Sequence, residues 1–515
     1  MKFNKYIYSL LIASISITGC TKDFEAVNTS PTSVNDLSSD LLLTNTIIGV
    51  SGGEYEAWRT NLIYNSQFVQ HFASTNWNQG NRFEFNEGYN SSLWDAYYGG
   101  PIKNLVNLVA KTTVEAGKPN PDVNYNSAAR ILKAFAFMRL TDSYGNIPYS
   151  EAGKGYLNGT FSPKYDDQQA IYADIVNELD AAAKAFDASK PFKGDITTYN
   201  GNVTLWKKAA YSLMLRAGMR LSKVDAATAA TVVAKAVAGG VIGSNDENFS
   251  VKHTSTYDNP NSHVLGYYNG SRYELAAGGF KFSKFFIDMM NTKADPRLKI
   301  LSVVRTGGAS EIGVEDNTVS IQKGIPNGID PQGFTGLTTY SQLRSDFANA
   351  TVPNMLVTFG ETLLLHAEAR ERGWITAGTA EQYFRDGVKA AIHQLKGYDN
   401  GSNSAFAGLF NVAAIDTYTA TTLAFPAGTT ARLQAINEQY YIATLLDEYE
   451  AHANWRRSGY PAITAGYSGG YSNGVIPRRF QYPSSETSMN GTNLKAAVTK
   501  QGADTWVTRV WWDKL

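Results

Sequence analysis

The sequence predicts a mostly α-helical fold, a tetratricopeptide-like scaffold of helix pairs interrupted by long irregular loop insertions. Apolar residues recur every three to four positions in several stretches, which is the spacing of one face of a helix. These stretches come in pairs, separated by turns rich in Pro, Asn and Gly. Two long segments, about residues 245–353 and 456–505, lack this periodicity and are rich in Gly, Asn, Ser and Tyr. Helix pairs in series are typical of α-solenoids, although the consensus of the tetratricopeptide repeat is absent.

The predicted helices fall into two blocks, about residues 88–240 and 355–460. In the first block, Leu105 and Leu108 lie on one apolar stripe, and the next stretch continues the spacing with Ile131 and Phe135. A second pair begins near Asp166, which is a predicted N-cap. The second block repeats the arrangement. The predicted helices cover residues 93–109, 128–140, 166–186, 205–221, 361–372, 380–395 and 433–455.

The N-terminus is typical of a bacterial lipoprotein signal. Lys2 and Lys5 precede an apolar run at residues 7–17, and the run ends at Gly19-Cys20. That run is about half the roughly 20 residues that a membrane-spanning helix needs. We therefore expect a signal peptide at residues 1–19, a lipidated Cys20 with a flexible linker to residue 40, and a single helical domain at residues 41–515.

Composition limits the classes of function. The chain has 46 basic and 46 acidic residues, so it lacks the basic surface of a nucleic-acid-binding protein. Cys20 is the only cysteine, and acylation would consume it, which leaves no thiol for a disulfide or a zinc site. Tyr, Trp, Asn and Gly are abundant, and such surfaces suit neutral polar ligands whose C–H faces stack on rings. The same composition is also found in extracellular proteins with long loops.

Catalytic and metal patterns are weak. Gly466, Ser468 and Gly470 match the spacing of a nucleophile elbow, but no histidine follows them in the chain. The six histidines include no zinc-binding pair at helical spacing. The sequence predicts no cofactor, and a structural calcium ion stays unassigned, since the oxygen ligands near Asp246 and Asp399 do not fit a twelve-residue calcium loop.

Several segments occur in the order found in one family of bacterial lipoproteins. They include Gly145-Asn146-Ile147-Pro148-Tyr149, Asp295-Pro296-Arg297-Leu298 and Asn454-Trp455-Arg456-Arg457. The full set spans residues 93–98, 134–149, 291–298, 360–374, 450–461 and 476–490. In these segments, and in its lipoprotein signal, the chain resembles the SusD/RagB family of outer-membrane nutrient-binding lipoproteins, in particular the SusD-like branch.

This resemblance implies a tetratricopeptide-like body whose loops carry the ligand site. It also implies a protein displayed on the outer membrane that binds an oligosaccharide or a peptide, without catalysis. The implied partner is a TonB-dependent transporter barrel (SusC-like). Asp23 and Glu25 after the cysteine resemble the surface-export signals of such lipoproteins. Two other classes stay open at this point: a helical glycoside hydrolase, which would need two facing carboxylates, and a structural lid that binds no ligand.

Two loops supply the candidate ligand contacts. Asn76, Trp77, Asn78 and Arg82 place an indole among amides and a guanidinium in a Gly-containing loop, and an exposed indole there would stack on a sugar or peptide. The second cluster surrounds an Asn-Gly turn, where a tyrosine and an arginine are expected to reach the ligand. It consists of Tyr267, Tyr268 and Arg272. Packing is the alternative role for both loops.

Other aromatic and basic residues are expected to be structural. Trp94, Tyr97 and Tyr98 recur at helical spacing and are predicted to lie in the core. The arginine pairs at residues 456–457 and 478–479 are predicted to form structural ion pairs with carboxylates such as Glu486.

Overall fold

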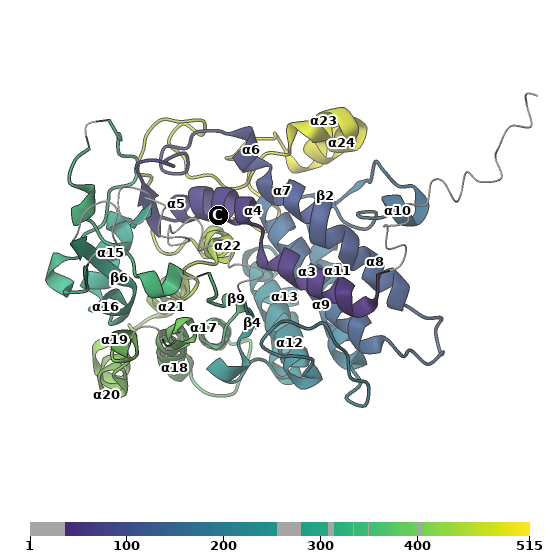
Figure 1. Cartoon of the computed structure of the whole chain (residues 1–515), viewed down its shortest axis with the longest axis horizontal. Helices are drawn as coiled ribbons and strands as arrows, with labels where there is room; N and C mark the ends of the chain where they lie inside the picture. The colour runs from purple at the N-terminus through teal and green to yellow at the C-terminus, as the bar shows by residue number, and fades with distance from the viewer. Residues whose placement is uncertain are drawn as a thin grey trace, which may run out of the picture.

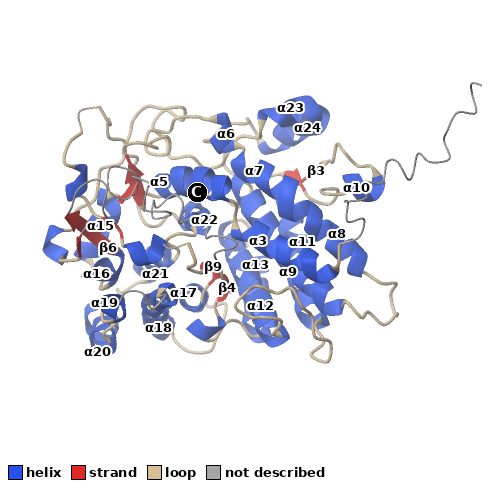
Figure 2. Ribbon diagram, viewed as in Figure 1, coloured by secondary structure: helices blue, strands red, loops and turns tan. Residues whose placement is uncertain are grey.

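Helices make up most of the chain in the computed structural model, as the periodicity predicted (Figure 2). The structure describes residues 37–254, 280–306, 314–332, 334–348, 350–399, 401 and 404–515. In this part of the chain no helix is both long and apolar enough to cross a bilayer.

The first block of helices fills the right half of the molecule in Figure 1. Each long helix packs against the next, α8 on α9, α9 on α11, α11 on α12 and α12 on α13. The apolar stripe of α11, with Ile171, Ile175 and Leu179, is fully buried, which explains why periodicity located this helix. The helices are α3 (Ser39–Ser51), α8 (Lys103–Thr112), α9 (Val123–Tyr144), α11 (Gln168–Ala185), α12 (Val203–Arg220) and α13 (Ala226–Gly239).

The second block consists of α17 (Phe359–Glu371), α18 (Ala380–His393), α21 (Thr429–Ala443) and α22 (Glu448–Ser458). The first three lie at the lower left of Figure 1, and α22 lies near its centre. The side chains of Thr358 and Thr379 cap the first two of these helices. Two glycines allow α17 and α18 to approach closely. A Cβ atom on Gly360 would lie 2.8 Å from Ala391, and one on Gly387 would lie 3.0 Å from Leu364.

Three predicted helix boundaries were wrong. Residues 433–455 form two helices, because Leu446 adopts a left-handed backbone (φ 80°) between α21 and α22. Residues 93–109 are divided into α7 (Ser92–Tyr97), a π-helical stretch η2 (Tyr98–Ile102) that contains Pro101, and α8. Asp166 is not the N-cap of α11. It lies in a strand, and its carboxylate accepts bonds from the backbone N–H groups of Tyr149 and Ser150.

The expected loop-rich segments contain regular structure as well. Residues 456–505 include α23 (Ser484–Met489) and α24 (Gly491–Gln501). The described part of residues 245–353 includes α15 (Lys284–Thr292) and α16 (Arg297–Leu301). Shorter helices elsewhere are α10 (Gly155–Asn158), α19 (Ser404–Ala407) and α20 (Val412–Thr417).

The strands are short and pair antiparallel. The pair β1 (Phe72–Ser74) and β5 (Phe280–Phe282) positions the loop that follows β1. The others are β2 (Ile147–Pro148) with β3 (Tyr165–Asp166), β4 (Phe249–Val251) with β9 (Asn354–Val357), and β6 (Ser302–Thr306) between β7 (Val314–Asp316) and β8 (Gln342–Leu343). The pairs β1–β5 and β4–β9 join segments far apart in the sequence.

Buried ion pairs join the two helical blocks. Arg216 on α12 pairs with Glu361 on α17 at 2.7 Å, and Arg220 contacts Glu450 on α22. Burial alone would raise the pKa of Glu368, but the charge of Arg457, 2.7 Å away, lowers it to about 2. Breaking such a pair leaves a buried charge without compensation, so these contacts fix how the blocks pack.

The structural roles predicted for other residues are confirmed, but Arg456 forms no ion pair with a described carboxylate and donates to the carbonyls of Asp142 and Arg478 instead. Trp94 and Tyr97 are buried, and the hydroxyl of Tyr98 donates to the carbonyl of Pro148. The arginines at 478 and 479 form ion pairs as predicted, but their partners are Asp513 and Asp504. Glu486 instead accepts a hydrogen bond from Tyr165.

Candidate ligand-binding site

Four aromatic rings meet where the loop after β1 packs on two short helices. Tyr55 lies on α4 (Glu54–Glu56), Trp58 on the π-helical stretch η1 (Ala57–Asn65), and Tyr89 on α6 (Glu87–Asn90). The fourth ring belongs to Trp77. Trp58 is at the centre, with ring centroids 5.4 Å from Trp77, 6.3 Å from Tyr55 and 6.3 Å from Tyr89. We call Tyr55, Trp58, Trp77 and Tyr89 the aromatic platform. α4 and α6 lie along the upper part of Figure 1.

The platform is partly open to solvent. Tyr55 is 57% exposed, and the other three rings are half-buried. Trp77 stacks on Phe280 of β5 at 6.3 Å, so one face is packed against the core. Trp77 therefore has the packing role predicted as the alternative, and it stays half-buried rather than fully buried.

Hydrogen bonds hold Trp77 in place. Its backbone N–H donates to the hydroxyl of Ser74 at 3.2 Å, and its carbonyl accepts from the amide of Gln67 at 2.6 Å. The guanidinium of Arg59 lies over the rings of Tyr55 and Tyr89, at 4.9 Å and 5.6 Å. These contacts fix the rings before any ligand arrives.

The other predicted residues of the first loop lie in different environments. Asn76 is exposed next to Trp77, whereas Asn78 is buried. Arg82 joins three loops: it pairs with Glu84 at 3.2 Å and Asp330 at 3.7 Å, and it lies over the ring of Tyr467. The second predicted cluster, Tyr267, Tyr268 and Arg272, lies outside the described residues.

A buried carboxylate lies next to the platform. Glu56, between Tyr55 and Trp58 in the sequence, is 2% exposed, and among the described residues its carboxylate has only a weak contact with the backbone of Gly53. Burial raises its pKa to about 7, and the opposing charge of Arg139 compensates only in part. The carboxyl faces Arg139 and Asp447, and it belongs to the same short helix as Tyr55.

Comparison with known proteins decides the family. A family model described as starch-binding and associating with the outer membrane matches residues 31–483. The chain belongs to the SusD-like family. Members of this family are non-catalytic nutrient-binding proteins associated with the outer membrane, so the hydrolase alternative is excluded. Membership of this family implies a carbohydrate ligand, which is the class that the sequence predicted.

Solved structures of SusD-like proteins share the fold. A chitin-binding protein is 34% identical, covers 93% of this chain and 100% of its own, and superposes with a TM-score of 0.80. A chitin-binding SusD homologue from Flavobacterium johnsoniae is 25% identical over 92% of this chain and 98% of its own, with a TM-score of 0.74. A SusD homologue from Bacteroides fragilis at 24% identity covers 93% of this chain and 100% of its own, with a TM-score of 0.73. A search of curated proteins found no match.

The remaining sequence patterns form no catalytic or metal centre in the described ranges. Gly466, in the elbow-like pattern, packs on the backbone of Asn327 in a loop, and no strand leads into it. No three His, Cys, Asp or Glu side chains among the described residues are grouped to hold a metal ion.

Sequence reasoning missed three of the four platform residues. Tyr55 and Trp58 lie on a short helical stretch, and their three-residue spacing is also that of core positions. Tyr89 follows an Asn-rich turn. These rings meet Trp77 because the segments around α4 and α6 fold onto the loop after β1, and that contact is not visible in local sequence.

Proposed function

We propose that this SusD-like protein captures an oligosaccharide on the aromatic platform and passes it to a TonB-dependent transporter. The observation that carries the proposal is the contact of Trp58 with Trp77, which presents two half-buried indoles beside an exposed Tyr55. Sugar rings stack their C–H faces on such aromatic surfaces, while neighbouring amides such as Asn76 bind their hydroxyl groups.

The geometry suits reversible capture. Each stacked ring contributes on the order of 1 kcal/mol and each hydrogen bond a similar amount, so a few contacts give micromolar to millimolar dissociation constants. A protein that hands its ligand to a transporter has to release it, and this range permits release.

A chitin-like oligomer of N-acetylglucosamine is the first ligand to test. The 34% identical relative is a chitin-binding protein, and its similarity extends over 93% of this chain. A starch oligomer is the second, because the family description names starch.

The anchor and the transporter belong to the same proposal. The signal at residues 1–19 and Cys20 would attach the protein to the outer membrane, and the predicted linker to residue 40 would join the lipid to the body. Palmitate labelling of wild type and Cys20→Ala tests the anchor, which is wrong if the wild type is unlabelled. Co-purification with a transporter barrel tests the partner.

Calorimetry with chitohexaose and maltohexaose tests the platform. Because each indole offers stacking area, Trp58→Ala and Trp77→Ala should each weaken binding by about tenfold, or about 1.4 kcal/mol. Trp374→Ala is the matched control, because Trp374 is a half-buried indole beside Arg372, away from the platform. Unchanged affinity in both platform variants would remove the site, and binding of peptides instead of glycans would change the ligand class.

The other predicted contacts are tested by the same titration. Asn76→Ala should weaken binding several-fold without affecting stability, because the side chain is exposed. Arg82→Ala should lower stability as well, since Arg82 joins three loops. Tyr267, Tyr268 and Arg272 stay predictions, and their alanine variants complete the set.

A further inference from the structure

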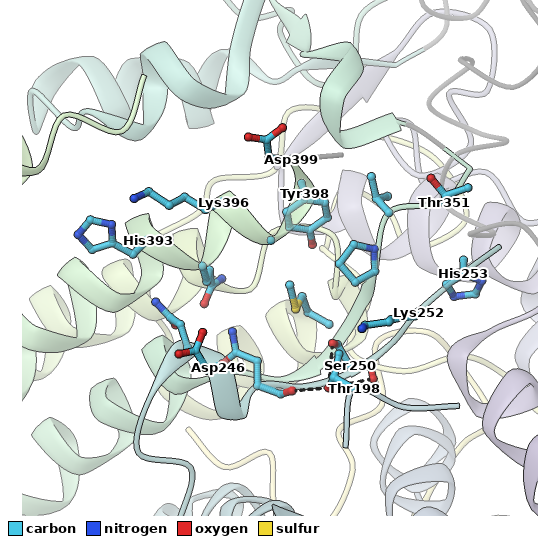
Figure 3. Close-up of a pocket in the computed structure, with 17 residues that line it drawn as sticks. Thr198, Asp246, Ser250, Lys252, His253, Thr351, His393, Lys396, Tyr398 and Asp399 are labelled. Carbon is cyan, nitrogen blue, oxygen red and sulfur yellow. Dashed lines mark hydrogen bonds between the residues drawn. The ribbon is translucent and has the colours of Figure 1, made fainter. Parts of the chain in front are cut away.

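A second polar cavity of about 710 Å³ lies away from the platform, between the β4–β9 pair and the end of α18 (Figure 3). This volume is in the range of small-molecule sites. Four separate segments supply its walls, and none of the platform residues lines it. The lining includes Asn245, Asp246, Lys252, His393, Lys396 and Asp399.

The charges around the cavity balance. Figure 3 shows Lys252 on one side of the cavity and Lys396 on the other. The carboxylates of Asp246 and Asp399 also lie around it. Neither lysine forms an ion pair with a carboxylate of the described chain. Two ammonium groups and two carboxylates attract no net charge, so the cavity favours a neutral ligand that offers donors and acceptors together.

Two buried amide oxygens in this wall have no donor. The nitrogen of Asn245 donates to the carbonyl of Ala390 at 3.1 Å, and that of Gln394 donates to Ala443 at 3.1 Å. The oxygens of both amides are buried without a hydrogen-bond partner in the described part of the chain, and Gln394 is only 7% exposed. Both oxygens lie behind the accessible surface, so they make this wall polar without contacting a ligand directly.

The rest of the lining completes a mixed surface. Burial, Lys396 and Lys389 lower the pKa of His393, so its neutral ring supplies one donor and one acceptor at pH 7. Val352, Pro353 and Met355 add apolar surface. A ligand with many hydroxyl groups and apolar C–H faces matches this combination.

We propose that this cavity is a second saccharide-binding site that takes a short neutral oligosaccharide. The proposal rests on the proposed function for the ligand class, but not on the platform residues. Asp246 and Lys252 would bind hydroxyl groups from exposed positions, and the neutral ring of His393 would offer one donor and one acceptor.

Hydrogen exchange of the purified protein, titrated with chitotriose and maltotriose, tests the two sites separately. Residues 245–253 and 393–399 report on the cavity, and residues 55–58 and 74–90 report on the platform. We expect at least one trisaccharide to protect the cavity segments in the wild type and in Trp58→Ala. The double variant Asp246→Asn, Lys252→Ala should weaken protection of the cavity at least tenfold and leave the platform unchanged.

Matched controls keep the outcomes distinct. Lys495→Ala removes an exposed lysine on α24 that does not line the cavity and should change nothing. Protection by neither sugar, or equal protection in the double variant, would overturn the second site. Protection by dialanine instead of both sugars would overturn its ligand class. Cavity protection without platform protection would remove the platform proposal and leave this one standing.

Discussion

Replacing Glu56 by Gln should remove a pH-dependent loss of stability. Burial raises the pKa of Glu56 from 4.5 to about 7. The folded protein therefore holds this proton more tightly than the unfolded chain does, so stability is highest when the carboxyl is protonated in both states. As the pH rises from about 4.5 to above 7, the carboxyl ionises in the unfolded chain before it ionises in the folded protein. Ionisation therefore stabilises the unfolded chain more, and the free energy of unfolding falls.

The magnitude follows from the shift. About 2.5 pKa units correspond to roughly 3.4 kcal/mol when both states are ionised. Between pH 5 and pH 8.5 the contribution changes by about 2.5 kcal/mol, because the unfolded carboxyl is already partly ionised at pH 5. The charged groups that face Glu56 are Arg139 and Asp447, and Tyr97 presents its hydroxyl nearby. All three are retained in the variant.

Urea unfolding followed by tryptophan fluorescence measures this difference. The stability of Glu56→Gln minus that of wild type should become more positive by about 2.5 kcal/mol between pH 5 and pH 8.5. Any constant cost of burying the new amide cancels, since it is the same at both pH values. A difference that stays within about 0.5 kcal/mol across this range would show that Glu56 does not titrate as argued.

Further substitutions test the packing. Arg457→Met should cost roughly 3–5 kcal/mol in urea unfolding, because Glu368 is left buried and charged. Adding Glu368→Leu should recover most of that loss, and a double variant no better than the single one would contradict the reasoning. Ala294→Gly should be neutral or stabilise by up to about 1 kcal/mol, since Ala294 has φ 48°, whereas Ala227→Gly on the exposed side of α13 should cost about 1 kcal/mol. Gly466→Ala should cost about 1–3 kcal/mol, because a Cβ atom would lie 2.4 Å from the carbonyl oxygen of Asn327, and an unchanged thermal midpoint would contradict that contact.

The sequence located the long helices because their apolar stripes are buried. The spacing of Ile131 and Phe135 predicts α9, and both side chains are in the core. The break between α21 and α22 was missed, because a leucine in a left-handed conformation leaves no local signal of the kind that Gly or Pro provides. The sequence placed the N-cap of α11 at Asp166, whereas the observed N-cap is Asp167. A shift of one residue is within the usual uncertainty of helix ends.

The platform was less accessible to sequence reasoning than the scaffold. The sequence predicted Trp77 as a ligand contact because its neighbours are amides and glycine. Trp58 was not predicted as one, since its helical surroundings resemble a core position. The cavity by β4 and β9 was also partly visible: Asp246 and Asp399 were noted as oxygen ligands, but their proximity depends on the packing of segments about 150 residues apart. Residue chemistry is local, whereas the assembly of a site depends on tertiary pairing.

The scaffold pre-organises the platform through polar contacts. The side chain of Asn61, on the same π-helical stretch as Trp58, donates to the carbonyl of Leu446 at 3.1 Å and accepts from the N–H of Glu448 at 3.0 Å. His71, just before β1, bonds to the carboxylate of Glu448 at 2.6 Å. The segments that carry Trp58 and Trp77 are therefore both fixed to the start of α22. Since the rings need little ordering when a sugar binds, weak stacking contacts are enough for capture, and no large rearrangement has to be reversed for release.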